Sequence, residues 1–228
     1  MATKLAIEKL VTVFGGSGFL GRHVVRALAQ RGYRIRVAVR RPGLAGYLQP
    51  MGRVGQIHAV QANLRYPDSV AAALRDADVA VNLVGLMLER GGQRFDAIMT
   101  QGAETVAKAA SAVGAPLVHV SSLSAEPESA SHYARTKGEG EELVRRAQSG
   151  AIIVQPSILF GPEDDFFNRF AAMSRLMPAL PLVGGGHTRM QPVFAGDVAE
   201  GLAKAVDGEL KSGLSLIHIS EPTRQAEI

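Results

Sequence analysis

The sequence has 228 residues, of which 46% are hydrophobic and 20% are charged, and its formal net charge is +4. This length and composition suit one globular core, or a core with a small second lobe, and exclude a disordered chain. The sequence contains no cysteine, which excludes disulfides, thiolate metal sites and a cysteine nucleophile. The charge excess is too small to indicate a nucleic-acid-binding surface, so we expect no nucleic-acid partner.

The sequence pattern gives no sign of a membrane span or of a targeting segment. No apolar run reaches the about 18 residues that a membrane-spanning helix needs. Residues 1–9 are too short for a signal or transit peptide, so we expect a cytoplasmic protein. Basic residues gather at Arg31, Arg34, Arg36, Arg40 and Arg41. Such a cluster suits an anionic ligand, which we favour, or an anionic membrane, which would place the protein peripherally at the cytoplasmic face of the inner membrane.

Strands and helices are expected to alternate along most of the chain. Short apolar runs predict buried strands at 10–14, 34–39, 56–60, 80–84, 116–120 and 151–155. Apolar residues at helical spacing predict helices at 18–31, from 67 with Asp68 as N-cap, from 95 to 114, and at 131–148. This succession predicts an α/β fold, a Rossmann-type doubly wound parallel sheet with helices on both faces.

The remainder of the chain is less regular. Residues 163–177 predict a helix whose phenylalanines, Phe166, Phe167 and Phe170, face a core rather than a lipid or quinone surface. A turn is expected at 182–186, an extended segment at 191–197 and a helix at 198–206.

These patterns divide the chain into three parts. We expect a nucleotide-binding domain over residues 1–160 and a small, truncated C-terminal substrate lobe over residues 161–213. Residues 214–224 resemble the in-frame translation of a transposon-end sequencing adapter. We therefore expect residues 214–228 to be a non-native tail, and part of the substrate lobe to be missing.

A glycine-rich turn joins the first predicted strand to the first predicted helix. Gly15 permits a tight turn with positive φ, Gly18 lets a pyrophosphate approach the backbone, and Gly21 lets the helix pack closely on the strand. A pyrophosphate there would meet the free N–H groups and positive dipole end of the helix. An ordinary βα turn is the alternative, but the flanking strand and helix favour a dinucleotide site. Its expected residues are Gly15, Ser17, Gly18, Phe19, Leu20 and Gly21.

The second predicted strand ends in arginines rather than in a carboxylate. Arg40 and Arg41 follow Val39, where an NAD-binding fold usually carries Asp or Glu against the ribose hydroxyl. A guanidinium forms charge-assisted, often bidentate bonds to a 2′-phosphate, and Arg22 could add to them. We therefore predict that NADP(H) is preferred over NAD(H). The alternative is that these arginines are solvated surface charges.

The glycine spacing, with Phe19-Leu20 before the last glycine, resembles the short-chain dehydrogenase/reductase superfamily in its extended or atypical branch. The resemblance implies that Asn63 and Leu64 lie against the adenine, although Asn63 is nearly as well explained as a turn residue. It also implies that the end of the fourth strand lies along the ribose and nicotinamide, and that a proline-containing segment follows the sixth strand near the nicotinamide. The residues concerned are Leu83, Val84, Gly85, Pro156 and Ser157.

Tyr133 and Lys137 form a Y-x-x-x-K pair on one face of a predicted helix. The lysine ammonium is expected to lower the pKa of the tyrosine, which could then exchange a proton with a substrate while hydride passes to or from nicotinamide. Lys137 could also hold the ribose, and Ser122, with Ser121 as a rival, could polarise a substrate carbonyl. The alternative is an exposed Tyr/Lys pair. The presence of Ser122, Tyr133 and Lys137 does not guarantee turnover, so we leave open whether the protein is an enzyme.

Two further features are expected to be structural. His119 lies in an apolar strand and is expected to pack in the core. The acids at 163–165 are better explained by a helix dipole than by a metal, so we predict no metal site.

Three segments narrow the resemblance further: 13–22, 81–85 and 156–170, the last containing Gly-Pro-Glu-Asp followed by Phe-Asn-Arg-Phe. With residues 191–198 they resemble the nucleotide-binding accessory subunit family of respiratory complex I (NADH:ubiquinone oxidoreductase), in a bacterial form. This resemblance implies a protein that holds NADPH and supports the complex, with complex I subunits as partners. Two alternatives stay open: an NADP-dependent reductase, epimerase or dehydratase acting on a small molecule, and a regulator that senses the NADP(H) ratio.

Overall fold

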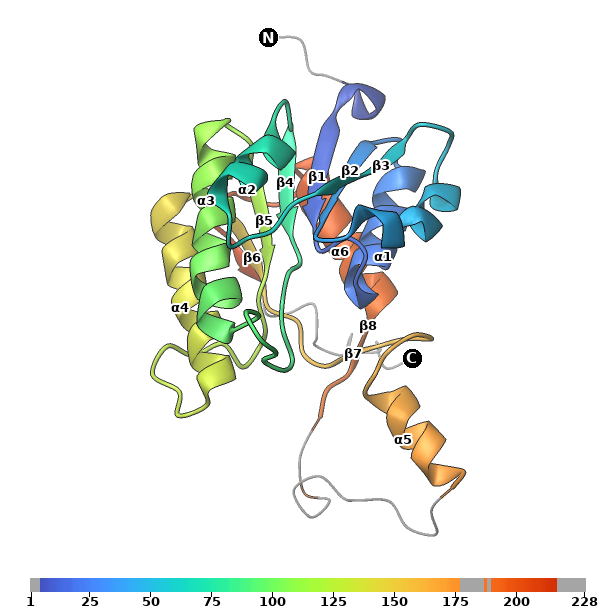
Figure 1. Cartoon of the computed structure of the whole chain (residues 1–228), viewed down its shortest axis with the longest axis vertical. Helices are drawn as coiled ribbons and strands as arrows, with labels where there is room; N and C mark the ends of the chain where they lie inside the picture. Colours follow the sequence, from blue (N-terminus) through green and yellow to red (C-terminus); the bar gives the residue numbers. More distant parts are fainter. Residues whose placement is uncertain (1–4, 177–186, 188–189, 217–228) are drawn as a thin grey trace, which may run out of the picture.

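The computed structural model describes residues 5–176, 187 and 190–216. Its centre is a seven-stranded parallel sheet in the order β3-β2-β1-β4-β5-β6-β9, which confirms the predicted α/β doubly wound fold (Figure 1). The strands are β1 (Leu10–Phe14), β2 (Arg34–Val39), β3 (Ile57–Gln61), β4 (Val79–Asn82), β5 (Leu117–Val120), β6 (Ile152–Val154) and β9 (Ser215–Leu216).

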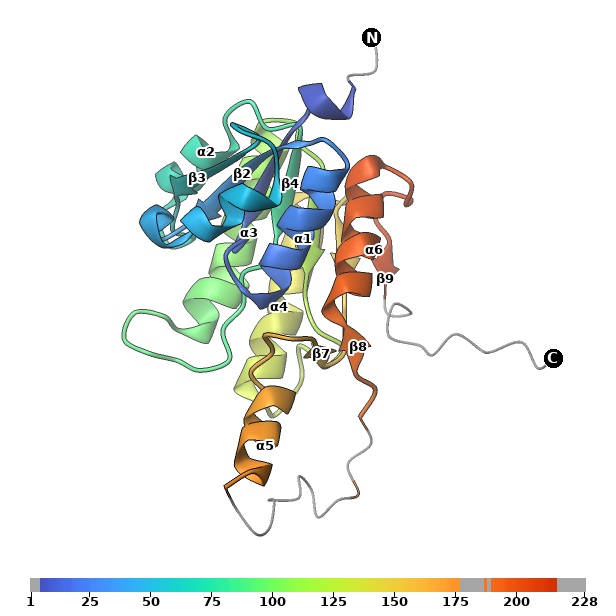
Figure 2. The ribbon, with the colours of Figure 1, turned by 90° about the vertical axis from the view of Figure 1, so that its right-hand side faces the viewer.

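Helices cover both faces of the sheet. The α-helices are α1 (Phe19–Gln30), α2 (Pro67–Leu74), α3 (Gln101–Ala112), α4 (His132–Ala147), α5 (Phe167–Ser174) and α6 (Ala195–Asp207). Helices α2, α3 and α4 lie side by side on one face, and α1 and α6 on the other (Figures 1 and 2). Strands β1 and β4 are buried along their whole length because both faces are covered, which explains their continuous apolar runs.

Each face of the sheet has its own apolar core. On the side of α1 and α6, the strands pack against Val24, Leu28 and Leu202, all fully buried. On the other side they pack against Leu74, Val106 and Val144 of α2, α3 and α4, also fully buried. These two cores hold the carboxyl ends of the central strands at one common edge, where the functional site lies.

One local expectation is wrong. Asp68 is not the N-cap of α2, because Pro67 is already the first helical residue and Tyr66 precedes it. Proline suits that first position because its missing N–H would have no helical partner there. The helix predicted from 95 to 114 is present, and it begins with a π-helical turn over Asp96–Thr100 that runs directly into α3.

The predicted core position of Phe166, Phe167 and Phe170 is wrong as well. None of the three is buried in the described structure, and α5 has no buried residue. The helix extends away from the sheet, next to the small parallel pair of β7 (Leu159–Phe160) and β8 (Val193–Phe194) (Figure 2). The Phe166 ring instead packs on its neighbours, 5.1 Å from the ring of Phe167 and 5.2 Å from that of Phe170.

The end of the described chain adds the edge strand β9. The backbone N–H of Ile153 donates to the Leu214 carbonyl at 2.9 Å, and Ser215 and Leu216 pair with β6. Backbone pairing of this kind does not depend on which side chains are present, so the adapter-like tail at 214–228 and the boundaries at 160 and 213 stay predictions. The turn expected at 182–186 lies outside the described residues, as do residues 217–228. Within the described part, no helix combines the length and apolarity that crossing a membrane requires.

Candidate functional site

A cavity of about 230 Å³ opens at the carboxyl ends of β1 to β4. The chain runs outward from β1 to β2 and β3, then returns to β4 on the other side of β1, so the cavity lies at the switch point where doubly wound sheets bind ligands. Its lining residues are Gly15, Ser17, Gly18, Ala38, Val39, Arg40, Ala62, Asn63, Leu64, Leu83, Val84, Gly85, Leu86, Gln93 and Ile98. The predicted cofactor residues from all four strand ends are thus brought together.

The glycine turn has the geometry that its spacing predicted. Gly15 has φ +77°, a conformation that L side chains rarely adopt. The Gly18 N–H donates to the Gly15 carbonyl at 3.0 Å, and α1 begins at the next residue. A Cβ added to Gly21 would lie 2.4 Å from the Gly15 carbonyl oxygen. Gly21 therefore lets α1 start directly against the turn.

The turn fits a pyrophosphate. A Cβ added to Gly18 would meet only the Gly15 oxygen, at 3.3 Å, so the cavity side of this residue is open. The first turn of α1, with Phe19, Leu20 and Gly21, presents N–H groups that have no partner within the helix. Open space beside helix N-terminal donors is the arrangement that binds phosphate groups. The side chains of Phe19 and Leu20 do not line the cavity, and Leu20 is buried in the core.

Arg40 lies at the rim of the cavity with an exposed side chain. No ion pair involves Arg40 among the described residues. Arg41, also exposed, precedes a short 3₁₀ segment and does not line the cavity. Of the two predicted arginines, Arg40 is therefore the one placed to meet a ligand.

Arg22 is engaged elsewhere. Its guanidinium pairs with Glu163 at 2.9 Å and lies 5.3 Å from the centre of the Tyr47 ring. The Tyr47 hydroxyl donates to the Ser17 carbonyl at 2.6 Å, which ties the segment after β2 to the glycine turn. Sequence reasoning missed Tyr47, since no spacing pattern links it to the turn.

Asn63 combines the two roles that the sequence left open. It lines the cavity, and its Oδ1 accepts from the Arg65 N–H at 3.2 Å, as a turn-forming asparagine does. Its contact with an adenine stays a prediction.

Two buried side chains behind the cavity, Asn82 and His119, hold the backbone at the end of β4 in place. Asn82 donates from its amide to Nδ1 of His119 at 3.2 Å, and its Oδ1 accepts from the Val84 N–H at 3.1 Å. Burial, with smaller contributions from Lys137 and Arg145, lowers the pKa of His119 to about 3, so the ring is neutral and can accept at Nδ1. His119 is packed in the core as expected, and it also positions the backbone of Leu83 and Val84 beside the cavity.

Ser122 and Tyr133 meet beside this wall. Ser122 lies near enough to the Tyr133 phenol to lower its pKa, and the Ser122 Oγ lies 3.2 Å from the Ser124 Oγ. Ser121 is buried instead, and its hydroxyl has no partner among the described residues. The geometry therefore favours Ser122 over Ser121 as the partner of Tyr133.

The expected effect of Lys137 on Tyr133 is wrong for this structure. Burial raises the pKa of Tyr133, and nearby Ser122 lowers it by less. The Lys137 Nζ is turned toward β4 and β5: it donates to the Val120 carbonyl at 3.3 Å and lies 3.6 Å from where a Gly85 Cβ would be. Burial lowers the pKa of Lys137 to about 8, although Glu141 acts in the opposite direction. Lys137 thus reaches the wall of the cavity rather than the phenol.

The proline-containing segment lies outside the cavity lining. The Pro156 carbonyl accepts from the Leu123 N–H at 3.0 Å, and the Ser157 hydroxyl donates to the Gln191 carbonyl. These bonds join the segment after β6 to the loop after β5 and to the residues just before β8. A role for Pro156 and Ser157 in holding a nucleotide stays a prediction.

Comparison with known proteins adds to this geometry. The model of the NAD dependent epimerase/dehydratase family matches residues 11–213. The mitochondrial NADH dehydrogenase (ubiquinone) 1 alpha subcomplex subunit 9 of Dictyostelium discoideum is 32% identical over 206 residues, which cover 90% of this chain and 57% of that one. Ceramide reductase from Caulobacter vibrioides is 35% identical over 215 residues, covering 94% of this chain and 65% of that one. The chain therefore spans less than two thirds of the length of these relatives.

A solved structure supports the fold. The dTDP-glucose 4,6-dehydratase of Streptomyces venezuelae, determined with NAD bound, superposes with a TM-score of 0.74 at 22% identity. The match covers 90% of this chain and 74% of that one.

Substitutions at the last two glycines of the turn, Gly18 and Gly21, should have different effects. Gly21→Ala should lower the free energy of unfolding by at least roughly 1–3 kcal/mol, because its Cβ would collide with the Gly15 carbonyl. Gly18→Ala should cost clearly less stability, because its Cβ would lie 3.3 Å rather than 2.4 Å from that oxygen, and should weaken NADPH binding by about tenfold or more, since its Cβ would enter the pyrophosphate side. Urea unfolding and NADPH titration of both variants check this. Equal loss of stability in the two variants would contradict it.

The buried Lys137 predicts a pH dependence of stability. Its folded-state pKa, about 8, is below the ordinary 10.5, so from about pH 8 to pH 10.5 the unfolded chain binds more protons and stability rises with pH. As the pH rises from about 7 to about 9.5, the deprotonation of Lys137 should raise the free energy of unfolding by roughly 2 kcal/mol. Denaturant unfolding of wild type and Lys137→Met across this range measures the difference. A constant difference between the two proteins would show that Lys137 is not desolvated.

Proposed function

Because the chain belongs to the NAD dependent epimerase/dehydratase family, we propose that it binds NADP(H) in the cavity at the ends of β1 to β4. We propose further that it holds the cofactor as an accessory or assembly subunit of respiratory complex I. Family membership agrees with the expected extended branch of the short-chain dehydrogenases/reductases. The proposed cofactor preference and the proposed role in complex I do not follow from family membership alone. Each is supported by a separate observation.

The proposed preference for NADP(H) rests on the position of Arg40. It is the basic side chain at the cavity rim, it follows β2 directly, and β2 ends in no carboxylate. A 2′-phosphate brought there would find a guanidinium, whereas an NAD-selective strand end presents an acid to the ribose hydroxyls. The glycine turn supplies backbone donors for the pyrophosphate of both NAD(H) and NADP(H). Arg40 is therefore the residue proposed to distinguish the two cofactors.

The similarity to complex I subunits supports the holding role. Subunits with the same name from Dictyostelium discoideum and Rattus norvegicus are 32% and 36% identical to this chain. The partners proposed from this similarity are other subunits of the complex, and the proposed place is the cytoplasmic face of the membrane that carries it. Such a protein would contact the membrane peripherally.

A reductase, epimerase or dehydratase is the second candidate, and the position of Ser122 beside the Tyr133 phenol supports it. A bound nicotinamide would supply hydride transfer. Tyr133 would exchange the proton at the substrate oxygen, and Ser122 would hold that oxygen by hydrogen bonding. Lys137, directed at Gly85, would hold the ribose rather than act on the phenol. Similarity to ceramide reductase from Caulobacter vibrioides agrees with this candidate.

Replacement of Arg40 tests the cofactor preference. Arg40→Ala should weaken NADPH binding roughly 10- to 100-fold, the value of a lost charge-assisted hydrogen bond, and leave NADH binding within about twofold. Arg34→Ala is the matched control, because Arg34 is an exposed arginine at the opposite end of the same strand. Isothermal titration calorimetry with both nucleotides measures the effect. Unchanged NADPH affinity in Arg40→Ala, or tighter binding of NADH than NADPH by wild type, would overturn the assignment.

Replacement of Tyr133 separates the two candidate functions. If the protein only holds its cofactor, Tyr133→Phe should retain NADPH through purification as wild type does, and neither protein should oxidise NADPH with ketones or nucleotide sugars. If the protein is an enzyme, wild type should turn over, and Tyr133→Phe should lose about 10²- to 10⁴-fold in rate while binding NADPH normally. Absorbance of NADPH and identification of the nucleotide released on denaturation provide the two measurements.

A further inference from the structure

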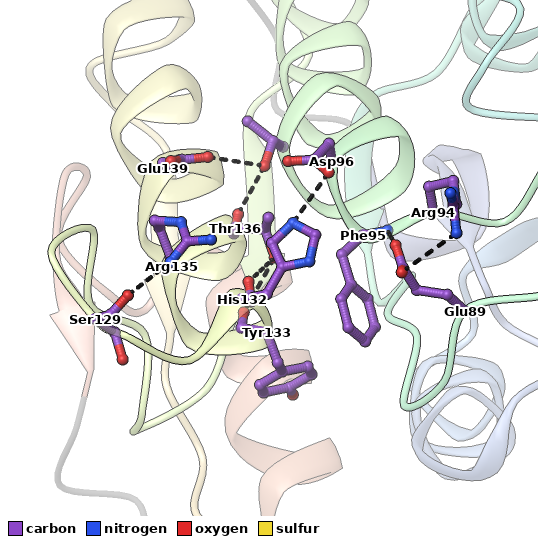
Figure 3. Close-up of polar contacts among 11 residues, drawn as sticks. Glu89, Arg94, Phe95, Asp96, Ser129, His132, Tyr133, Arg135, Thr136 and Glu139 are labelled. Carbon is purple, nitrogen blue, oxygen red and sulfur yellow. Dashed lines mark hydrogen bonds and ion pairs between the residues drawn. The ribbon is translucent and has the colours of Figure 1, made fainter.

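Three side chains that can ligate a metal meet beside Tyr133 (Figure 3). Glu89 lies in the loop after β4, Asp96 begins the π-helical turn, and His132 is the first residue of α4. One ligand atom from each lies within 4.8 Å of those of the other two. The residues come from three different elements, and His132 is 36 residues after Asp96, so no spacing pattern revealed them.

The three groups are held in place by contacts with Phe95 and with one another. The Phe95 N–H donates to Glu89 Oε1 at 2.8 Å, which orients that carboxylate. The Phe95 ring packs edge-on against the imidazole of His132, with 5.5 Å between ring centres. His132 Nε2 lies 3.0 Å from Asp96 Oδ2. The π-helical turn that positions Asp96 is a rare conformation, and such turns are frequent at functional sites.

The cluster carries more negative than positive charge. Two carboxylates face one imidazole, and one of the carboxylates pairs with Arg94, whose guanidinium lies 3.6 Å from Glu89 Oε2. Figure 3 shows Arg94 on the far side of Glu89 from His132. The Arg94 side chain is 66% exposed, so it can turn into solvent at little cost. A divalent cation between the three ligands would balance both carboxylates.

The donor set also indicates which kind of cation fits. One imidazole nitrogen and two carboxylate oxygens suit first-row transition ions, whereas Mg²⁺ and Ca²⁺ prefer oxygen alone. Zn²⁺ with ligands at about 2.1 Å brings the ligand atoms to about 3.5 Å from one another. The side chains would therefore close by roughly 1 Å, which their partial exposure permits.

We propose that Glu89, Asp96 and His132 form a binding site for one divalent transition-metal ion, with Zn²⁺ as the expected occupant. The ion ties the loop after β4 to the start of α4, one residue before Tyr133. This site goes beyond the proposed function and does not depend on it. It also replaces the expectation of no metal, which was judged on the acids at 163–165. There, Asp164 accepts from the Asn168 N–H at 3.3 Å at the start of α5.

Zinc titration of the tag-free protein, stripped with a chelator, tests the proposal. Isothermal titration calorimetry with ZnCl₂ should show one tight site in wild type, weakened more than about tenfold in His132→Ala and in Glu89→Gln. His58→Ala is the control, because His58 is an exposed histidine on β3 outside the cluster, and it should bind as wild type does. Unfolding curves without metal establish that each variant is folded.

A second readout tests what the ion does. The exposed Arg90 and Arg94 are trypsin sites in the loop after β4, so Zn²⁺ should slow cleavage there in wild type but not in His132→Ala. Absence of Zn²⁺ binding in wild type would overturn the proposal. So would equal affinity in wild type and His132→Ala, which would identify an adventitious ion only. NADPH binding is measured in parallel and should be the same in all four proteins, so failure of the metal site and failure of the nucleotide site are distinguishable.

Discussion

The close contact between Gly21 and the Gly15 carbonyl is the constraint on which the site depends. A Cβ at position 21 would lie 2.4 Å from that oxygen, so α1 starts against the turn only because both residues are glycine. This contact directs the N-terminus of α1 at the cavity, which lies at the switch point of the sheet beside the end of β1. The direction of these N–H donors is therefore a consequence of packing, and the proposed pyrophosphate site depends on it.

A second set of interactions fixes the opposite wall of the cavity. Asn82 joins the neutral His119 to the Val84 N–H, and Lys137 reaches from α4 to the Val120 carbonyl beside Gly85. Each of these polar groups is buried, and each has a partner, as low-dielectric surroundings require. The wall thus connects β4, β5 and α4. Tyr133 lies on α4, the same helix as Lys137. The cavity wall and the neighbouring Ser122 and Tyr133 are therefore positioned by the same helix.

Features encoded within short stretches could be predicted from the sequence. The strands and the glycine turn follow from apolar runs and from residues a few positions apart, and the structure has them within a residue or two. Contacts between distant residues could not be predicted. Tyr47 bonds to Ser17, and Arg22 pairs with Glu163 rather than remaining available for a phosphate. The pKa of Tyr133 was predicted in the wrong direction, because burial depends on packing that spacing does not show.

The central claim is that the cavity at the switch point holds NADP(H) through the glycine turn and Arg40. A crystal structure of the protein with NADP⁺ bound tests this most directly. The account predicts the pyrophosphate against the backbone at Gly18 and the first turn of α1, with the 2′-phosphate within ion-pair distance of the Arg40 guanidinium. A nucleotide bound elsewhere, or a 2′-phosphate directed away from Arg40, would contradict it.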